Sequence, residues 1–364
     1  MTYGLYMHIP YCSGRCAYCD FYSTVAQAVP EGYIDALLRD FERFVPRDAA
    51  GVPLRPATVY FGGGTPGLLR PAQVARLMQA ANPLPTAEVT LELNPEQATP
   101  GRLAGWLSAG VNRLSVGVQS ACDAQLRRLG RRHTAADAAR ALRLARAAGF
   151  NNLSGDMMLA LPGDSRQAID ETVALLAAET THISAYLLKL ERGTPMGAAP
   201  PPGLPDADEA AELYRCAVDK LAQAGYARYE ISNFARPGFE GRHNLIYWDA
   251  GNWLGLGPSA HSCLSGRRFS FAANLPAMLR GASEPVDEGE LEADDYIMLR
   301  LRLDAGLDEA ALERRFGRRL SAGQQALLSQ LATADLATRT LGGWALTTGG
   351  MLVQNEILVR LLDL

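Results

Sequence analysis

Residues 6–21 read Tyr6-Met-His-Ile-Pro-Tyr-Cys12-Ser-Gly-Arg-Cys16-Ala-Tyr-Cys19-Asp-Phe21, and the rest of the chain is organised around this stretch. Its cysteines have the spacing Cys-x3-Cys-x2-Cys, so one loop can bring three thiolates to one metal centre. The odd number and the short gaps argue against disulfides. A structural zinc site takes four ligands, and no fourth Cys or His follows within a dozen residues. Three cysteines therefore favour a [4Fe–4S] cluster with one open iron, with zinc as the alternative.

Outward from this loop, strand-like apolar runs alternate with helical patterns. We expect strands at residues 3–9, 58–61, 89–93, 113–118, 153–159 and 183–190, with a seventh candidate at 227–231. Helices are expected between them, one from about residue 71 and others at about 100–109, 135–148, 165–178 and 208–224. Such βα units in series predict an α/β fold with a parallel sheet, and no unit has the pattern of an antiparallel hairpin. We predict a partial (β/α)6 TIM-like barrel, in which closure is plausible.

Polar and glycine-rich features fall where the predicted strands end. These are the cysteine loop, the glycines at 62–64, Glu92 with Asn94, and Gln119. In TIM-like barrels the chemistry lies at the carboxyl ends of the strands. Each feature alone is equally well explained as a turn or a helix cap. Their shared placement predicts one site, and the glycine run lacks the Lys of a nucleotide phosphate loop.

The composition is that of an ordinary globular protein, with 48% hydrophobic and 20% charged residues and a net charge of −4. This charge gives no reason to expect nucleic acid or an anionic membrane as a partner. The sequence has no signal-peptide pattern and no apolar run long enough for an integral membrane segment. Cys122, Cys216 and Cys263 are scattered singly, which together with an oxygen-sensitive cluster favours the reducing cytoplasm. The basic run at 127–132 is most simply a solvated helix end with one arginine used elsewhere.

The alternation of strands and helices ends near residue 235. We predict a barrel over residues 1–235, a connecting segment over 236–288, and a smaller, mainly helical and winged-helix-like C-terminal domain over 289–364. Short β elements are expected near 344–347 and 352–353.

The chain resembles radical S-adenosylmethionine (SAM) enzymes, and within them the oxygen-independent coproporphyrinogen III oxidase family. The cysteine spacing carries the first resemblance. The second rests on further stretches within residues 5–195, namely residues 5–10, 60–66, 91–95, 113–120, 129–131, 156, 161–163 and 182–184. In that superfamily SAM chelates the open iron, and its reductive cleavage gives a 5′-deoxyadenosyl radical.

The resemblance implies which residues hold the cofactors. Cys12, Cys16 and Cys19 would ligate the cluster as metal ligands, and Tyr18 would cover it. The SAM site would be lined by Tyr6, Gly63, Gly64, Thr65, Glu92, Gln119, Arg131 and Asp156. These residue types suit the task, because carboxylates accept hydrogen bonds from hydroxyl or ammonium groups and an arginine holds a carboxylate.

Two departures favour the haem-chaperone branch of that family. The oxidases have a fourth cysteine where this chain has Phe21, and a long N-terminal arm that it lacks. The chaperone branch is marked by His-Asn-x-x-Tyr-Trp, present as His243, Asn244, Tyr247 and Trp248. These residues would contact haem, because imidazole can ligate iron and aromatic faces can pack on a porphyrin. A single histidine among aromatics is otherwise more often structural.

The resemblance thus implies a haem chaperone without coproporphyrinogen oxidase activity. It would bind a [4Fe–4S] cluster, SAM and haem, and deliver haem to haem-accepting proteins such as respiratory enzymes. The alternatives are a radical SAM oxidase that acts on coproporphyrinogen, and a non-catalytic zinc-binding α/β protein.

Overall fold

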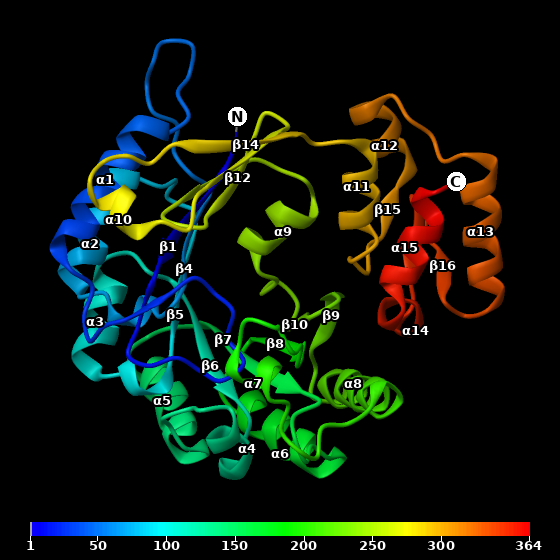
Figure 1. Ribbon diagram of the computed structural model, residues 1–364, viewed down its shortest axis with the longest axis horizontal. Helices are drawn as coiled ribbons and strands as arrows, with labels where there is room; N and C mark the ends of the chain where they lie inside the picture. The colour runs from blue at the N-terminus through cyan, green and yellow to red at the C-terminus, as the bar shows by residue number, and fades with distance from the viewer. Residues whose placement is uncertain (1) are drawn as a thin grey trace.

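The computed structural model describes residues 2–364, and its largest feature is one mixed sheet of 12 strands. Six parallel strands lie side by side in chain order at the centre of this sheet (Figure 1). They are β1 (Gly4–Ile9), β4 (Thr58–Gly63), β5 (Glu88–Leu93), β6 (Arg113–Gln119), β7 (Asn152–Leu159) and β8 (His182–Leu187). The six predicted βα units are therefore confirmed, since parallel neighbours require crossover connections and helices supply them.

The crossover helices lie along the outer side of the curved sheet (Figure 1). They are α1 (Glu31–Phe44), α2 (Pro71–Ala81), α3 (Pro100–Ser108), α5 (Ala135–Ala147), α6 (Arg166–Ala177) and α8 (Ala207–Gln223). Shorter elements at the strand ends are β2 (Tyr11–Cys12), β3 (Thr24–Val25), η1 (Pro66–Leu68), η2 (Pro95–Gln97), α4 (Asp123–Arg128) and α7 (Pro195–Ala198). Local sequence sets the helix starts: α2 and α3 carry proline at their first position, and the Thr99 side chain caps α3.

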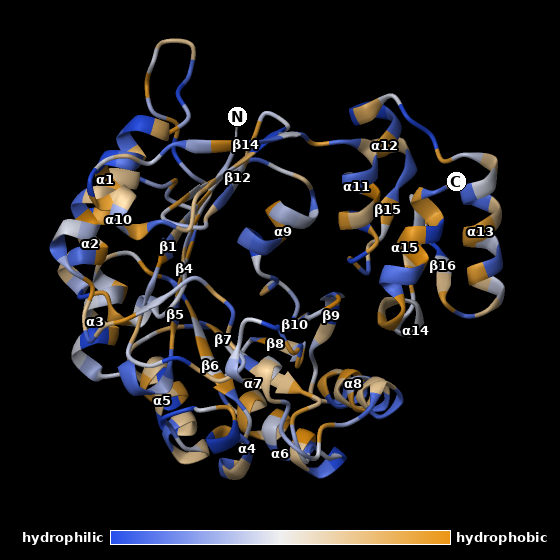
Figure 2. Ribbon diagram, in the orientation of Figure 1, coloured by the Kyte–Doolittle hydropathy of each residue, from blue (hydrophilic) through white to orange (hydrophobic). Residues whose placement is uncertain are grey.

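The two faces of the central strands differ in chemistry. On β5, Val89, Leu91 and Leu93 are buried in the main hydrophobic core beneath the outer helices. The alternate residues Thr90 and Glu92 belong to the inner face, because side chains on a strand alternate between faces. The outer helices carry both hydrophobic and hydrophilic residues, as expected for helices that bury one side only (Figure 2). The sheet is thus sealed outside by apolar packing and lined inside by polar groups.

The barrel is not closed, because the sheet runs from edge strand β14 to edge strand β9 without joining. The seventh strand candidate, at 227–231, is confirmed as a strand, but its expected place in the parallel series is wrong. Strand β9 (Ala227–Glu230) pairs antiparallel with β10 (Asn233–Ala235), and β10 pairs antiparallel with β8. This hairpin ends the parallel series. The sequence pattern missed it because β10 has only three residues.

Residues 242–290 return to the other edge of the same sheet. Strand β11 (Trp253–Leu256) pairs parallel with β1, and β12 (His261–Leu264), β13 (Arg267–Phe271) and β14 (Pro285–Glu290) continue antiparallel from it. Helix α10 (Leu275–Leu279) connects the last two strands. Helix α9 (Arg242–Trp248) lies on the inner side of the sheet (Figure 1). The segment predicted to be a connection therefore contributes four strands to the main sheet.

The C-terminal residues have a second hydrophobic core. It is built by helices α11 (Ala293–Arg300), α12 (Glu309–Phe316), α13 (Ala322–Thr333), α14 (Thr348–Leu352) and α15 (Gln354–Leu362). A small sheet accompanies them, formed by β15 (Leu307–Asp308), β16 (Ala337–Arg339) and β17 (Gly343–Leu346). The β element expected near 344–347 is confirmed, whereas the one at 352–353 is wrong because α14 ends there. The predicted domain limits and the winged-helix likeness stay predictions. Within residues 2–364, every helix is too short or too polar for a bilayer span.

Candidate functional site

A cavity of about 440 Å³ lies at the carboxyl ends of the parallel strands. It is lined by the cysteine loop and by the ends of β4 to β8. Most of the residues that the sequence singled out line it together, namely Cys12, Cys16, Tyr18, Cys19, Gly63, Gly64, Thr65, Glu92, Gln119, Arg131 and Asp156. The structure thus brings these side chains into one place, and their assignment to particular cofactors stays a prediction.

The cysteine loop is held by protein backbone. Cys12 ends β2, which pairs with β3, and the following loop carries Cys16 and Cys19. The Ala17 N–H donates to the Leu129 carbonyl at 3.1 Å, and the Ala17 carbonyl accepts from the Met196 N–H at 2.9 Å. All three thiols are free. The loop is therefore fixed by bonds to two distant parts of the chain.

The thiols are close enough to influence one another. Burial raises the pKa of the Cys19 thiol above its usual value, and the thiols of Cys16 and Cys12 raise it further. Within residues 2–364, no three His, Cys, Asp or Glu side chains converge at the spacing of a single bound ion. An iron–sulfur cluster is larger than one ion, and its ligands surround it without meeting at a point. Three free thiols on the wall of one cavity are compatible with such a cluster.

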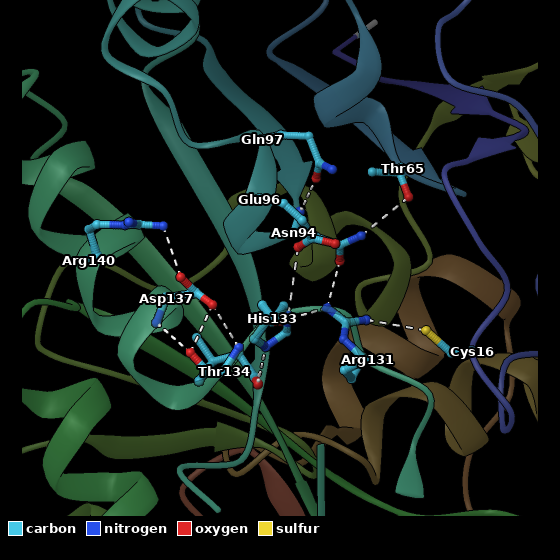
Figure 3. A network of polar contacts seen from close by, with 12 residues as sticks. Cys16, Thr65, Asn94, Glu96, Gln97, Arg131, His133, Thr134, Asp137 and Arg140 are labelled. Atoms are coloured by element: carbon cyan, nitrogen blue, oxygen red, sulfur yellow. Dashed lines mark hydrogen bonds and ion pairs between the residues drawn. The ribbon is translucent and has the colours of Figure 1, made fainter. Parts of the chain in front are cut away.

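Arg131 connects the cysteine loop to the strand ends (Figure 3). Its Nη1 lies 3.5 Å from the Cys16 Sγ, and its Nη2 donates to the Asn94 Oδ1 at 2.6 Å and to the Gly117 carbonyl at 2.7 Å. The Asn94 Nδ2 in turn lies 3.5 Å from the Thr65 Oγ1. Arg131 is thus used elsewhere, as expected from the sequence. It is not alone, because Arg128 donates to the Pro162 carbonyl and Arg132 donates to the Ser13 carbonyl, each at 3.0 Å. A guanidinium beside Cys16 stabilises negative charge on that sulfur.

Glu92 is a buried carboxyl group at the end of β5. The Tyr60 hydroxyl donates to its Oε1 at 2.7 Å, and the Gly63 N–H donates to its Oε2 at 3.2 Å. Burial raises the pKa of Glu92 to about 7, although both hydrogen bonds act to lower it. Glu92 is therefore poised to change its charge near neutral pH, and a cationic or hydroxyl-bearing ligand would favour its ionised form.

Two further polar groups come from β6 and β7. The Ser115 hydroxyl donates to the Asp156 Oδ1 at 3.0 Å, and burial raises the pKa of Asp156 above its usual value. Gln119 has a φ of 69°, in the left-handed region, and the register of β6 against β7 shifts at this point. Such conformations cost energy outside glycine and often accompany functional sites. The irregular strand end places Gln119 on the cavity wall.

The glycine run lies close to the chain's own backbone. A Cβ on Gly64 would lie 2.7 Å from the Ile9 carbonyl oxygen, and a Cβ on Gly63 would lie 2.5 Å from the His8 ring. The Gly64 N–H also donates to the Ile9 carbonyl at 2.9 Å. We expected these glycines to let a ligand approach, and both do line the cavity. Their lack of side chains is required first for packing against β1 and the residues that follow it.

Tyr6 does not line the cavity. Its hydroxyl is hydrogen-bonded to the His8 Nδ1 at 3.1 Å, and its ring stacks on Tyr60 with a centroid distance of 6.1 Å. Tyr60 is the residue that donates to Glu92. In this structure Tyr6 therefore lies behind the site and supports its wall.

His243 is buried beneath the same wall, with 1% of its surface exposed. Its Nδ1 is hydrogen-bonded to the Thr58 hydroxyl at 2.7 Å and its Nε2 to the Tyr247 hydroxyl at 2.7 Å. Burial and the nearby Arg113 charge lower the pKa of His243 to about 3. Both ring nitrogens are thus engaged, and this conformation leaves neither for a haem iron. The arrangement is that of a structural histidine, which was the alternative interpretation of the motif.

The other motif residues lie on the same short helix, α9. Asn244, Tyr247 and Trp248 are partly buried. The Tyr247 ring packs edge-on against His243, and Trp248 lies beneath the Arg302 guanidinium at 5.4 Å. None of the four motif residues lines the cavity. A haem contact at this helix stays a prediction that would require α9 to move.

Several cavity residues were not singled out as site residues from the sequence. Ser115 and Gly117 line the cavity together with Gln119. All three lie on one strand at alternate positions, so the two-residue period of β6 was a signal that could have found them. Tyr186 and Leu187 at the end of β8, and Lys189 just after it, also line the cavity. Tyr186 and Leu187 are consecutive, so no two-residue period marked them, and no motif did.

The comparisons with known proteins agree with this geometry. The model of the Radical SAM superfamily matches residues 6–176. The "Heme chaperone HemW" of Haemophilus influenzae is 34% identical over 373 residues, covering 97% of this chain and 96% of that protein. The HemW of Mycobacterium tuberculosis is 38% identical, covering 85% and 84% respectively.

Two further relatives bear on the fold. The mouse protein "Radical S-adenosyl methionine domain-containing protein 1, mitochondrial" is 44% identical over 71% of this chain, which spans 60% of its length. The structure of coproporphyrinogen III oxidase (HemN) from Escherichia coli, described as a radical SAM enzyme, aligns with a TM-score of 0.81. That alignment covers 99% of this chain and 89% of HemN at 22% identity, so it shows a common fold.

The superfamily match accounts for the cysteine loop, and membership of that superfamily implies a [4Fe–4S] cluster and SAM. The relatives at 34% and 38% identity extend well beyond it, into the C-terminal core. The chain therefore belongs to the radical SAM superfamily and, within it, to the heme chaperone HemW family.

Proposed function

We propose that the protein is a haem chaperone of the radical SAM fold, which binds haem and delivers it to haem-requiring proteins. The observation that carries the proposal is the single cavity at the strand ends, where three free cysteines meet buried carboxyl and guanidinium groups. The curated relatives named HemW, aligned over almost the full chain, supply the haem-chaperone part.

Cys12, Cys16 and Cys19 are proposed to hold the [4Fe–4S] cluster. When bound, the cluster and SAM together would supply reductive radical chemistry or, in a chaperone, a redox-sensitive site. The chain's own contribution is to fix the loop through Ala17 and to place Arg131 beside the Cys16 sulfur. Hydrogen bonds to ligand sulfurs tune iron–sulfur clusters.

The SAM site is proposed to be the rest of the cavity wall. Glu92 and Asp156 would accept hydrogen bonds from hydroxyl or ammonium groups, and Gln119 would offer both a donor and an acceptor. Buried carboxyl groups are costly without partners, and a cationic ligand relieves that cost. Gly63, Gly64 and Thr65 would border this site, while Tyr6 would act from behind through Tyr60.

The alternative function is a coproporphyrinogen III oxidase, and the common fold with HemN is what favours it. The sequence pattern of the oxidases requires a cysteine at position 21. Here Phe21 occupies that position and lies 61% exposed at the cavity. The chain therefore lacks one residue of the oxidase pattern, and we propose that it does not decarboxylate coproporphyrinogen.

The metal is tested by iron, sulfide and zinc analysis of anaerobically prepared protein. The proposal expects about four irons and four sulfides per chain for one [4Fe–4S] cluster. Cys16→Ala should lose the cluster absorbance, whereas the isolated Cys216→Ala should keep it. Stoichiometric zinc in the wild-type protein would overturn the cluster assignment.

The function is tested by haem titration of the cluster-loaded protein, with and without SAM and reductant. Transfer to a haem-free cytochrome, followed by absorbance, should accompany haem uptake. Coproporphyrinogen incubated under the same conditions should remain unchanged. Turnover of coproporphyrinogen without haem uptake would reverse the ranking of the two functions. The respiratory acceptor and the reducing cytoplasmic location expected from the sequence stay predictions.

A further inference from the structure

The cavity wall carries apolar side chains with exposed surface, and one of them, Tyr186, also lies near the carboxyl groups of Asp156 and Glu92. Phe21, Tyr186 and Leu187 line the cavity and are 61%, 43% and 38% exposed. We call these three residues the rim. Phe21 comes from the cysteine loop, and the other two come from the end of β8. Two distant segments of the chain thus meet at one opening and both present apolar surface there.

The other large exposed apolar side chains among residues 2–364 do not line this cavity. Leu107 lies on α3, Val286 on edge strand β14 and Val359 on α15. Single exposed apolar residues are normal on a protein surface, whereas a group that borders a cavity marks a binding site. The rim therefore differs from these residues because its three side chains together border one cavity, whereas Val359 borders a separate hollow on α15 beside the polar residues Asn355, Glu356 and Arg360.

Cationic side chains border the same opening. Arg15 and Lys189 both line the cavity. Lys189 pairs with Glu191 at 2.5 Å on the exposed surface, and such pairs contribute little net energy and exchange readily. Arg15 is exposed, and its guanidinium makes no ion pair with any residue among 2–364. The opening thus combines an apolar surface with cations that are available to a carboxylate.

We propose that the rim is the docking surface for haem, with the macrocycle on Phe21, Tyr186 and Leu187 and the propionates toward Arg15 and Lys189. The inference rests on the proposed function and names its binding surface. A flat apolar ring with two carboxylates matches this combination of groups, and aromatic faces pack well on extended ring systems. The motif helix α9 offers no comparable surface, because His243 is buried and both its nitrogens are hydrogen-bonded.

The rim predicts a definite pattern in haem titrations of the cluster-loaded protein. Phe21→Ser and Leu187→Ser should each raise the haem Kd by about tenfold, as expected from losing one good apolar contact. Val359→Ser, which removes a similarly exposed side chain on α15, is the matched control and should leave the Kd unchanged. Because all three residues are exposed, the thermal midpoint should change little, and the cluster absorbance verifies that Phe21→Ser keeps the adjacent loop intact.

The carboxylate contact is tested with two probes, haem and haem dimethyl ester. Arg15→Ala should weaken haem binding by about fivefold and leave the ester unaffected. The exposed Arg314→Ala on α12 is the control. Equal Kd values for the rim variants and Val359→Ser would overturn the inference while leaving the chaperone function in place. Absence of haem uptake by the wild-type protein would overturn the function itself, and loss of binding only in Tyr247→Phe would move the site to α9.

Discussion

At the scale of single residues, Glu92 links structure to solution behaviour. Its carboxyl group is buried at the cavity wall between the Tyr60 hydroxyl and the Gly63 N–H. A pKa near 7 means that the ionised fraction changes steeply around neutrality. Ligands that need a carboxylate acceptor therefore experience a different site at pH 6 and at pH 8.

We expect the affinity for SAM to rise with pH through the pKa of Glu92. If only the ionised form binds, affinity should increase by about tenfold between pH 6 and pH 8. Anaerobic calorimetric titration of the cluster-loaded protein measures this dependence. Tyr60→Phe removes a hydrogen bond that lowers the pKa, so its profile should shift to higher pH. Glu92→Gln is the control and should give a profile without this step; an unchanged profile would contradict the assignment.

His243 has a lowered pKa, in contrast to the raised pKa of Glu92, and this predicts how the stability of the protein depends on pH. Its pKa is lowered in the folded protein to about 3, so the unfolded chain binds a proton below pH 6.5 that the folded chain refuses. The contribution of His243 to the free energy of unfolding is fully present above pH 6.5. It decreases as the pH falls, by about 2 kcal/mol at pH 5. Urea unfolding measures the free energy of unfolding at pH 7 and at pH 5. Its decrease between these two pH values should be about 2 kcal/mol smaller in His243→Gln than in the wild type.

Comparison with His261→Gln controls for general effects of removing a histidine, because His261 is exposed on β12. That variant should keep the full acid sensitivity of the wild type. If His243→Gln kept it as well, the buried neutral histidine would not be its source.

At the scale of elements, helix α9 packs against β1 through a position without a side chain. A Cβ on Gly4 would lie 2.8 Å from the Thr58 Oγ1, 2.9 Å from the Ile246 Cδ1 and 3.1 Å from the His243 Cε1. The start of α9 is held by Glu88, whose carboxylate accepts from the backbone N–H groups of residues 242 and 243. Helix α9 thus contacts the sheet in two places. Its side packs against Gly4 of β1, and its first residues are hydrogen-bonded to Glu88 of β5.

Gly4→Ala should destabilise the protein by about 1–3 kcal/mol, the usual cost of overpacking a filled core. Chemical denaturation measures the change in the free energy of unfolding. Gly101→Ala is the matched control, because a Cβ there meets nothing within 4 Å on helix α3. It should be neutral or stabilising by up to about 1 kcal/mol. If Gly4→Ala has the same free energy of unfolding as Gly101→Ala, helix α9 can shift to accommodate the added methyl group at little cost.

The sequence predicted the six βα units because each has its own clear period and its own turn residues. It also predicted the gathering of strand-end residues, since parallel strands share one direction. It missed β10 and β11 because three or four residues carry too little pattern, and their place depends on which sheet edge is free. The burial of His243 could not be predicted either, since the motif does not reveal that Thr58 and Tyr247 occupy both ring nitrogens.

At the scale of the whole molecule, two hydrophobic cores meet at the end of α9. Ala250 belongs to the C-terminal core although it follows α9 directly. The Arg315 guanidinium donates to the Asp249 carbonyl at 2.7 Å and to the Ala250 carbonyl at 2.6 Å, and it lies over the Tyr296 ring. Arg315 of α12, together with Arg300 of α11, which pairs with Asp249, thus joins the C-terminal helices to the inner helix of the sheet.

Arg315→Ala should loosen this junction and leave the cavity intact. Hydrogen exchange of backbone amides in residues 245–251 should become faster by about tenfold, corresponding to about 1.4 kcal/mol of lost local stability. Exchange in β5 and β6 should not change. The neighbouring Arg314→Ala is exposed and serves as the control. Equal exchange in both variants would show that the Arg315 hydrogen bonds do not hold the junction, leaving it to the other contacts there, such as the Arg300–Asp249 ion pair.

The two backbone hydrogen bonds of Ala17 have a consequence for how a damaged cluster can be replaced. Since backbone hydrogen bonds to residues 129 and 196 hold the loop at Ala17, we expect this part of the loop to keep its position when the cluster is absent. Loss of the cluster through oxidation would then leave the cysteine loop in place at Ala17. Repair would need only fresh iron and sulfide, with no renewed folding of the surrounding chain.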